Sequence, residues 1–367
     1  MRLRNGIRWL GIMLCAVLLN LGPASGAVIE AQTLEYPAPA DFSLHHCEDE
    51  ACFWQLPMGD LDEEAIWEVM MQPVTVLTGN QRQIVKLYEA PNEKSRPVGE
   101  VTCESQALHV LETTEDGWAL VEVYSSSASK SVVRVFSDQV QGYIKTAKFK
   151  EKKPDPTYGL LLDKLKQRLY IFKEGKIITE LLVSTGLPNA QDPFNETPAG
   201  EFLIVSRSGG FWSGNMYCDM GLRINAGILI HEVPCLINAE NQRYYAPFEA
   251  ALGRKASHGC VRVQQAPNEQ GYNMRWIWDN VKVNTKVLIW DDVGRPIPLP
   301  DVDMPVYFNP SGGKYYHLDQ DCPSVSSRFR PLTPARYGDL DTEHPEKTPC
   351  HRCRPPQKLS VIEAENR

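Results

Sequence analysis

Short apolar runs that alternate with polar residues constrain the fold of this chain more than any other feature. Side chains of a strand point to opposite faces in turn, so such runs favour half-buried strands over helices. Between residues 74 and 150 they are separated by turn-forming groups such as Ala90-Pro91-Asn92 and Glu115-Asp116-Gly117. The predicted strands cover residues 84–88, 98–102, 107–113, 118–124 and 142–144. We expect this segment to form a small all-β barrel.

A second segment, residues 157–292, follows a charged, proline-bearing linker and shows the same pattern. Glu174-Gly175-Lys176 is a turn between two apolar runs and predicts a hairpin. One helix is predicted over residues 274–281. The predicted strands cover residues 159–162, 168–172, 177–184, 201–206, 222–224, 227–231 and 286–290. The fold class is therefore mainly β.

The N-terminus has the layout of a secretory signal peptide. Arg2, Arg4 and Arg8 precede an apolar run over residues 9–21, and small residues follow over 23–27. The run is shorter than the roughly 20 residues that a membrane-spanning helix needs. We therefore favour a signal peptide over residues 1–27 that is removed on export, rather than an uncleaved anchor.

Residues 28–73 are predicted to be an irregular linker or cap that contains one short helix over 62–71, closed by Pro73. Cys47 and Cys52 lie close enough in this segment for a short disulfide. The chain has ten cysteines, and nine remain when Cys15 of the signal peptide is left out. An odd number leaves at least one thiol free in a compartment that permits disulfides.

The charge of the chain argues against one class of partner. Its formal net charge is −8 and it has no run of lysines or arginines. Nucleic acid binding depends on positive charge. No nucleic acid partner is expected, and a neutral or zwitterionic substrate fits better.

The segment Ser257-His258-Gly259-Cys260-Val261-Arg262 carries the clearest chemical signal. A cysteine at a glycine-containing turn offers an exposed sulfur, with backbone N–H groups near a reacting oxygen. A thiol needs a base because little of it is ionised at neutral pH. His231, at the end of an apolar strand, is the favoured base over His258. A buried or disulfide-bonded Cys260 is the structural alternative.

Two resemblances follow from such motifs. Ala90-Pro91-Asn92, Asp116-Gly117-Trp118 and Gly142-Tyr143-Ile144 make residues 74–150 similar to a bacterial SH3-like domain, which implies either a wall-binding module or a spacer. Residues 157–292 resemble the L,D-transpeptidase catalytic domain, the YkuD family. That resemblance rests on the cysteine motif, on His231, and on Thr197-Pro198-Ala199-Gly200-Glu201-Phe202.

The YkuD resemblance implies an activity and a site. Cys260 would be acylated by a peptidoglycan stem after activation by His231, and no cofactor would be needed for catalysis. Ser257, His258, Gly259 and Arg262 would line the site, with backbone N–H groups of residues 258–260 as oxyanion hole.

A second stem would resolve the thioester to give a 3→3 cross-link. Water in its place would give an L,D-carboxypeptidase, and a non-catalytic wall-binding protein is the remaining alternative. A cysteine enzyme of this kind would be acylated by carbapenems.

The chain departs from the family pattern after His231, where Glu232-Val233-Pro234 and a long spacer precede Ser257. Residues 235–247 are interpreted as an inserted loop over the cleft, with a disulfide from Cys235 to Cys218 as one way to hold it. Either a backbone carbonyl or Glu232 would orient the histidine. Three aromatic residues are expected to shape substrate entry: Tyr244, Tyr245 and Trp212.

The tail over residues 305–356 has little predicted regular structure but is rich in cysteine and histidine. Its four candidate ligands are His317, Cys322, Cys350 and Cys353. Three thiols and one imidazole suffice for a tetrahedral zinc site. Disulfide pairing is the alternative, although three cysteines cannot all pair with one another.

Overall fold

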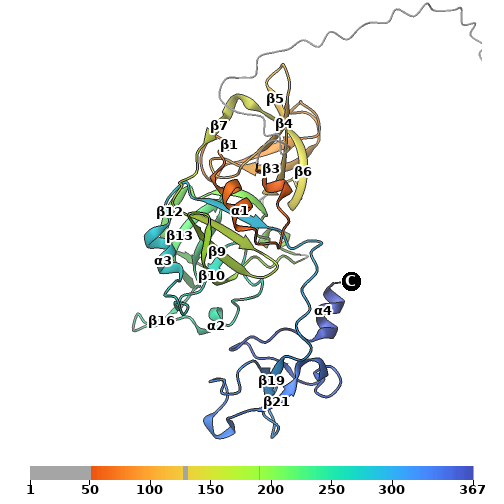
Figure 1. Cartoon of the computed structure of the whole chain (residues 1–367). Helices are drawn as coiled ribbons and strands as arrows, with labels where there is room; N and C mark the ends of the chain where they lie inside the picture. The colour runs from red at the N-terminus through yellow and green to blue at the C-terminus, as the bar shows by residue number, and fades with distance from the viewer. Residues whose placement is uncertain (1–50, 127–130, 190, 367) are drawn as a thin grey trace, which may run out of the picture. The chain divides into compact units, whose positions relative to one another are not determined.

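The computed structural model describes residues 51–126, 131–189 and 191–366 (Figure 1). The predicted signal peptide, residues 1–27, lies outside the described residues, as does Cys47. Cys52 is disulfide-bonded. No helix within the described part of the chain is long and apolar enough to cross a membrane.

The helix expected over residues 62–71 is confirmed as α1, Glu63–Met71, which follows the single turn η1, Phe53–Gln55. Asp62 caps it, since its carboxylate accepts hydrogen bonds from the backbone N–H groups of Glu64 and Ala65 at 3.2 Å. The buried face of α1 packs into an apolar cluster with residues of the segment 157–292, including Phe172. This segment is called the catalytic segment below, after the activity expected from its sequence.

The barrel segment is entirely antiparallel. Its five-stranded sheet has the order β3-β2-β6-β5-β4, and a two-stranded sheet joins β1 to β7. The strands are β1 Val74–Leu77, β2 Ile84–Tyr88, β3 Pro97–Thr102, β4 His109–Thr113, β5 Trp118–Ser126, β6 Phe136–Lys145 and β7 Phe149–Lys152; the turn η2, Thr146–Lys148, precedes β7. Leu87, Val101 and Val121 are fully buried in its core. The mainly β fold class is thus confirmed here, and the SH3-like identity of this segment stays a prediction.

The catalytic segment is built on a nine-stranded mixed sheet of order β11-β18-β8-β9-β10-β17-β14-β13-β12. The strands are β8 Gly159–Asp163, β9 Arg168–Lys173, β10 Lys176–Ser184, β11 Gly200–Leu203, β12 Ser206–Ser213, β13 Met216–Asn225, β14 Ile228–Glu232, β17 Val261–Val263 and β18 Lys286–Trp290. The pairs β14–β17 and β18–β8 are parallel. The helix α3, Met274–Asn280, packs Met274 and Ile277 into the core of the sheet.

Four further elements complete this segment: the turn η3 Pro193–Asn195, the short strands β15 Leu236–Ile237 and β16 Arg243–Tyr244, and the helix α2 Ala246–Glu249. β15 and β16 pair with each other, so the predicted inserted loop contains a small hairpin.

The tail has more regular structure than the sequence suggested. A four-stranded sheet has the order β21-β19-β20-β22, and a helix follows it. The elements are β19 Pro305–Phe308, β20 Tyr315–His317, η4 Ser327–Phe329, β21 Thr333–Arg336, η5 Tyr337–Asp339, β22 Thr348–Pro349 and α4 Leu359–Glu365. The expectation of little regular structure was wrong because these strands are too short for a readable alternation. The apolar cluster of the tail has only four fully buried members: Val306, Tyr316, Tyr337 and Leu340.

Backbone and side-chain hydrogen bonds join the barrel segment to the catalytic sheet. The backbone N–H of Ala107 donates to the carbonyl of Glu201 at 3.0 Å. The Asn225 amide, at the end of β13, donates to Ser126 Oγ at 2.7 Å and accepts from Thr102 Oγ1. All three of these side chains are buried, so this end of β13 is tied to the barrel through satisfied polar groups.

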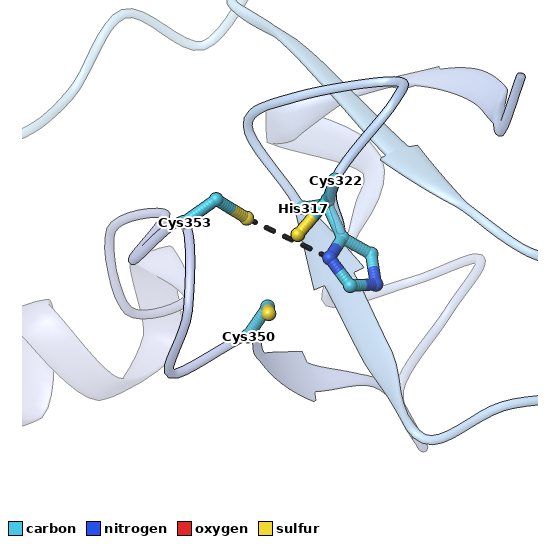
Figure 2. A group of neighbouring side chains, drawn as sticks. All are labelled: His317, Cys322, Cys350 and Cys353. Atoms are coloured by element: carbon cyan, nitrogen blue, oxygen red, sulfur yellow. Dashed lines mark hydrogen bonds between the residues drawn. The ribbon is translucent and has the colours of Figure 1, made fainter. Parts of the chain in front are cut away.

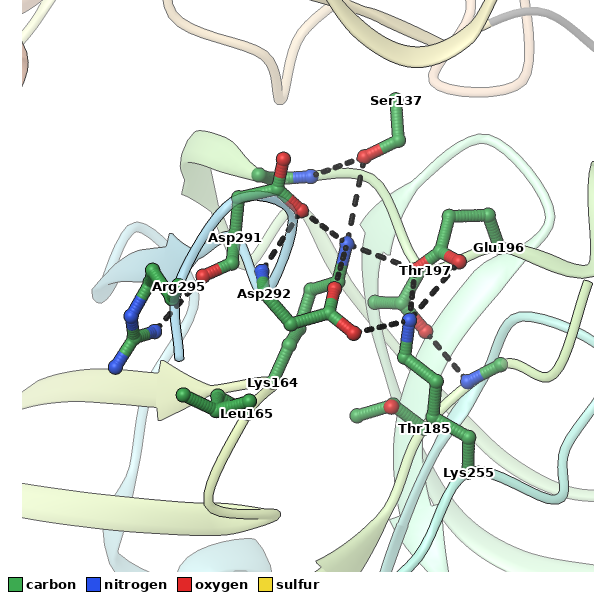
Figure 3. A network of polar contacts seen from close by, with 12 residues as sticks. Ser137, Lys164, Leu165, Thr185, Glu196, Thr197, Lys255, Asp291, Asp292 and Arg295 are labelled. Carbon is green, nitrogen blue, oxygen red and sulfur yellow. Dashed lines mark hydrogen bonds and ion pairs between the residues drawn. The ribbon is translucent and has the colours of Figure 1, made fainter. Parts of the chain in front are cut away.

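The buried ammonium group of Lys164 lies at the centre of an ion cluster in the catalytic segment (Figure 3). Lys164 Nζ lies 2.7 Å from carboxylates of Glu196 and Asp291 and 3.3 Å from Asp292, with its side chain fully buried. Burial acts to lower the pKa of Lys164, but the three carboxylates outweigh it and raise the pKa. Lys255 adds a second cation, 2.6 Å from Asp292 and 3.2 Å from Glu196.

We predict that Lys164→Met destabilises the protein by about 3–5 kcal/mol, because removing one member of a buried ion cluster leaves charge uncompensated. The matched control is Lys145→Met, since the ion pair of Lys145 with Glu93 is more than half exposed on both sides. Denaturant unfolding measures both changes. Equal, small losses of stability in the two variants would contradict the prediction.

Candidate active site

The parallel pairing of β14 with β17 brings the two predicted catalytic residues to one face of the sheet. The register joins Ile230 to Val261 and His231 to Arg262. Ile230 and Val261 belong to the buried core, so the side chains that alternate with them face the opposite side. Cys260, immediately before β17, therefore shares a face with His231, about 6.6 Å away along the strand direction.

The turn that presents Cys260 is held by two hydroxyl groups. Ser257 Oγ donates to the carbonyl of Cys260 at 2.5 Å and accepts from the N–H of Gly259 at 3.1 Å. Thr197 Oγ1 donates to the carbonyl of Gly259 at 2.7 Å and accepts from the N–H of Gly186 at 2.9 Å. Gly259 has φ +109°, a conformation that favours glycine. Ser257 and Thr197 thus fix the turn, and the N–H of Gly259 is engaged by Ser257.

His231 is held as a neutral base. Its Nδ1–H donates to the backbone carbonyl of Glu232 at 2.6 Å, which leaves Nε2 as the ring acceptor. Burial lowers the pKa of His231 to about 4; the positive charge of Arg262 acts in the same direction, and the Glu232 hydrogen bond acts against both. The ring is buried and meets Phe211 edge to face, with centroids 5.4 Å apart. Of the two orienting groups considered, the structure provides the backbone carbonyl.

The thiol of Cys260 is partly exposed and free. Its sulfur lies 3.9 Å from the carbonyl oxygen of Gly227. Burial raises the pKa of Cys260, while a backbone hydrogen bond from Leu229 and the charges of Arg262 and Arg223 partly offset this. The resting site therefore pairs a neutral thiol with a neutral imidazole.

Two arginines flank the sulfur. Arg262 is buried, donates to the carbonyl of Ala256 at 3.2 Å, and lies 5.9 Å from the ring centroid of Phe248. Arg223, on β13, donates to Ser208 Oγ at 3.2 Å and to the carbonyl of Ala226. Sequence reasoning missed Arg223. The available signal was an arginine inside an otherwise apolar predicted strand.

The remaining predicted site residues lie around this centre. His258 is exposed. Tyr245 donates from its hydroxyl to the Glu232 carboxylate at 2.8 Å. Tyr244 and Trp212 are 57% and 60% exposed, on β16 and at the end of β12.

The inserted loop is held differently from the disulfide that was considered. Cys218 and Cys235 are both free and buried. The backbone of Cys235 instead pairs with that of Tyr217, and Arg243 forms an ion pair with Asp219 at 3.0 Å. Backbone pairing and an ion pair, rather than a disulfide, therefore hold the inserted loop in place.

The four candidate metal ligands of the tail also come together (Figure 2). His317, Cys322, Cys350 and Cys353 place their ligand atoms within 4.8 Å of one another. Their side chains point toward a common centre in Figure 2, and His317, Cys322 and Cys350 are buried. All three cysteines are free, so the structure contains no disulfide among them.

The fold and site thus define a mainly β domain that sets a partly exposed thiol beside a neutral histidine. Residues 157–289 match the sequence model of the YkuD family, described as L,D-transpeptidase catalytic domain. The chain therefore contains an L,D-transpeptidase catalytic domain of the YkuD family.

The chain is also similar to individual proteins. A putative L,D-transpeptidase, YciB of Bacillus subtilis strain 168, is 28% identical over 128 residues, which cover 34% of this chain and 60% of that protein. The crystal structure of an L,D-transpeptidase from Xylanimonas cellulosilytica is 20% identical, with 38% of this chain and 64% of that one covered and a TM-score of 0.26. An L,D-transpeptidase structure from Mycobacterium smegmatis is 11% identical, covering 60% and 92%, with a TM-score of 0.29. The chain spans less than two thirds of the length of the first two proteins, and the family assignment rests on the sequence match.

The neutral pair predicts how the reactivity of Cys260 depends on pH. Because its pKa lies above the ordinary value near 9, its thiolate fraction should rise about tenfold per pH unit between pH 6 and 8. The alkylation rate of Cys260 by iodoacetamide, followed by peptide mass spectrometry, should rise in the same proportion. A preformed thiolate–imidazolium pair would instead give a rate that is nearly constant over this range.

Proposed function

We propose that this protein is an exported, cell-wall-associated L,D-transpeptidase that forms 3→3 cross-links between peptidoglycan stems through a Cys260 thioester. The observation that carries the proposal is the pairing of Cys260 and His231 on one sheet face within the family-matched residues 157–289.

In the first half-reaction, His231 Nε2 takes the proton of Cys260 as the sulfur attacks the carbonyl of residue three of a tetrapeptide stem. The backbone N–H groups of His258 and Cys260 are the proposed oxyanion donors, since that of Gly259 is engaged by Ser257. The imidazolium then protonates the departing amine of D-alanine. A thioester and a neutral His231 remain.

In the second half-reaction, the side-chain amine of a second stem attacks the thioester. His231 takes a proton from this amine and returns it to the sulfur as the C–S bond breaks. Arg262 is the proposed partner of a stem carboxylate, because it offers further N–H donors beside the sulfur. Water in place of the amine gives the carboxypeptidase reaction with the same residues.

We predict that wild-type protein incubated with disaccharide tetrapeptides releases D-alanine and forms a cross-linked dimer, and that carbapenems add once to Cys260. Cys260→Ala should lose all three reactions. His231→Ala should slow acylation by about 10²–10⁴-fold, the usual contribution of a general base. Intact-protein mass spectrometry and product analysis measure these outcomes.

Cys103→Ser is the matched control, because Cys103 is a free, buried cysteine of the barrel segment and takes no part in the mechanism. D-alanine release without dimer would assign a carboxypeptidase. No reaction and no carbapenem adduct would leave a non-catalytic wall-binding protein.

We infer that the tail cluster holds one structural zinc ion that takes no part in acyl transfer. Tetrahedral zinc with one nitrogen and three sulfur ligands requires a sulfur–nitrogen separation of about 3.6 Å. Cys353 Sγ lies 3.6 Å from His317 Nδ1. The ligand types and their spacing, with two residues between Cys350 and Cys353, fit zinc.

The surroundings of the sulfurs support the same inference. Backbone N–H groups of Leu318 and Arg352 point at Cys353 and Cys350, each at 3.3 Å. Such donors stabilise metal-bound thiolates. The four-residue apolar cluster of the tail is small for an independently stable unit, and a metal would supply the missing stability.

We predict one zinc ion per chain by elemental analysis of the purified protein. Cys350→Ser should lose the metal and make the tail sensitive to protease, while Cys103→Ser should keep it. Metal-free protein with an intact Cys350–Cys353 disulfide would contradict the inference. Carbapenem acylation of Cys260 should be the same in both variants.

A further inference from the structure

A pocket of about 240 Å³ lies at the junction of the barrel segment and the catalytic segment. The barrel contributes residues from the end of β5 and the start of β6, and the catalytic segment contributes the η3 region and the turn between β13 and β14. Six of its lining residues are Phe136, Phe194, Asn195, Glu196, Gly227 and His258.

This pocket borders the nucleophile. Gly227 lines it, and the carbonyl oxygen of Gly227 lies 3.9 Å from Cys260 Sγ. His258, two residues before Cys260, lines it as well. A ligand in this pocket would therefore be next to the group that reacts.

The lining presents no uncompensated charge. Its one carboxylate, Glu196, is paired with Lys164 at 2.7 Å and with Lys255 at 3.2 Å (Figure 3). No lysine or arginine is among the lining residues that the structure describes. A carboxylate of a peptide stem would lack a cationic partner here, so the pocket suits a neutral ligand.

Polar and aromatic groups at the pocket are available to such a ligand. Within the described residues, the side chains of Asn195 and His258 make no hydrogen bond. Phe136 of the barrel and Phe194 of the catalytic segment meet edge to face with ring centroids 3.8 Å apart, and both are half-buried. Amide and imidazole groups beside aromatic surface can hold a ligand that carries hydroxyl and acetamido groups on an apolar ring.

We propose that this pocket binds an N-acetylhexosamine unit of the glycan strand to which the reacting stem is attached. The inference rests on the proposed function and adds a role for the barrel segment: it supplies part of the substrate site. Sugar binding beside Gly227 would hold the attached stem near Cys260, so the enzyme would discriminate glycan-borne stems from free peptides.

The first test is binding without chemistry. Full-length Cys260→Ala is titrated with di-N-acetylchitobiose, a neutral probe without a stem, and saturation-transfer NMR follows the acetyl protons. Saturable transfer is expected. The affinity for the probe should fall at least tenfold in Phe136→Ala and Asn195→Ala. It should stay unchanged in Val132→Ala, because Val132 is a nearby residue that is 78% exposed and does not line the pocket. No saturable signal with the parent protein, or equal binding by all variants, would overturn the proposal.

The second test compares disaccharide tetrapeptide with free tetrapeptide as donor. Phe136→Ala and Asn195→Ala should each raise KM at least tenfold for the disaccharide substrate and leave KM for the free peptide and the carbapenem acylation rate unchanged. Equal effects on both donors would overturn the sugar site while leaving the transpeptidase in place. Absence of turnover by the wild type would instead refute the proposed function, and the binding test would still decide the sugar site.

Discussion

The parallel pairing of β14 with β17 is the constraint on which the site depends. These strands are separated in the chain by the β15–β16 hairpin and by α2, yet their register sets His231 opposite Arg262 and so places Cys260 on the same face. A shift of one residue would turn the thiol toward the core and Val261 toward the cleft. The buried side chain of Val261 resists such a shift, because the shift would move it out of the core that it shares with Ile230. Core packing therefore fixes the relative position of Cys260 and His231.

A second layer of contacts fixes the turn that carries the thiol. Thr197 bonds the carbonyl of Gly259, and its neighbour Glu196 belongs to the buried ion cluster around Lys164. Lys255, which precedes Ser257 by two residues, enters the same cluster from the other side. Burying charged groups is costly. Here the buried charges of the Lys164 cluster connect the segment before Thr197 to the segment before Cys260. The arrangement couples the stability of the domain to the position of the nucleophile.

Sequence patterns were sufficient for the parts of this protein that depend on local signals. Alternating runs predicted most strands, Pro73 marked the end of the helix expected over residues 62–71, and the cysteine motif with His231 led to the family assignment. β12 was missed because its residues are polar and glycine-rich and its side chains largely face solvent. The Lys164 cluster and the pocket beside Gly227 were missed for another reason. Each joins residues far apart in the chain, and no periodicity or spacing encodes such contacts.

His231 is oriented by a backbone carbonyl rather than by a carboxylate, and this difference affects the pKa of its imidazole. A carboxylate on Nδ1 would stabilise the imidazolium and raise the histidine pKa, which would favour a resting ion pair with Cys260. The Glu232 carbonyl fixes the tautomer but carries no full charge, and burial with Arg262 nearby keeps the ring neutral. In the proposed mechanism, proton transfer from the thiol becomes favourable only as negative charge passes from sulfur to the oxygen of a bound acyl group. The thiol is thereby kept protonated in the absence of a substrate that can accept this charge.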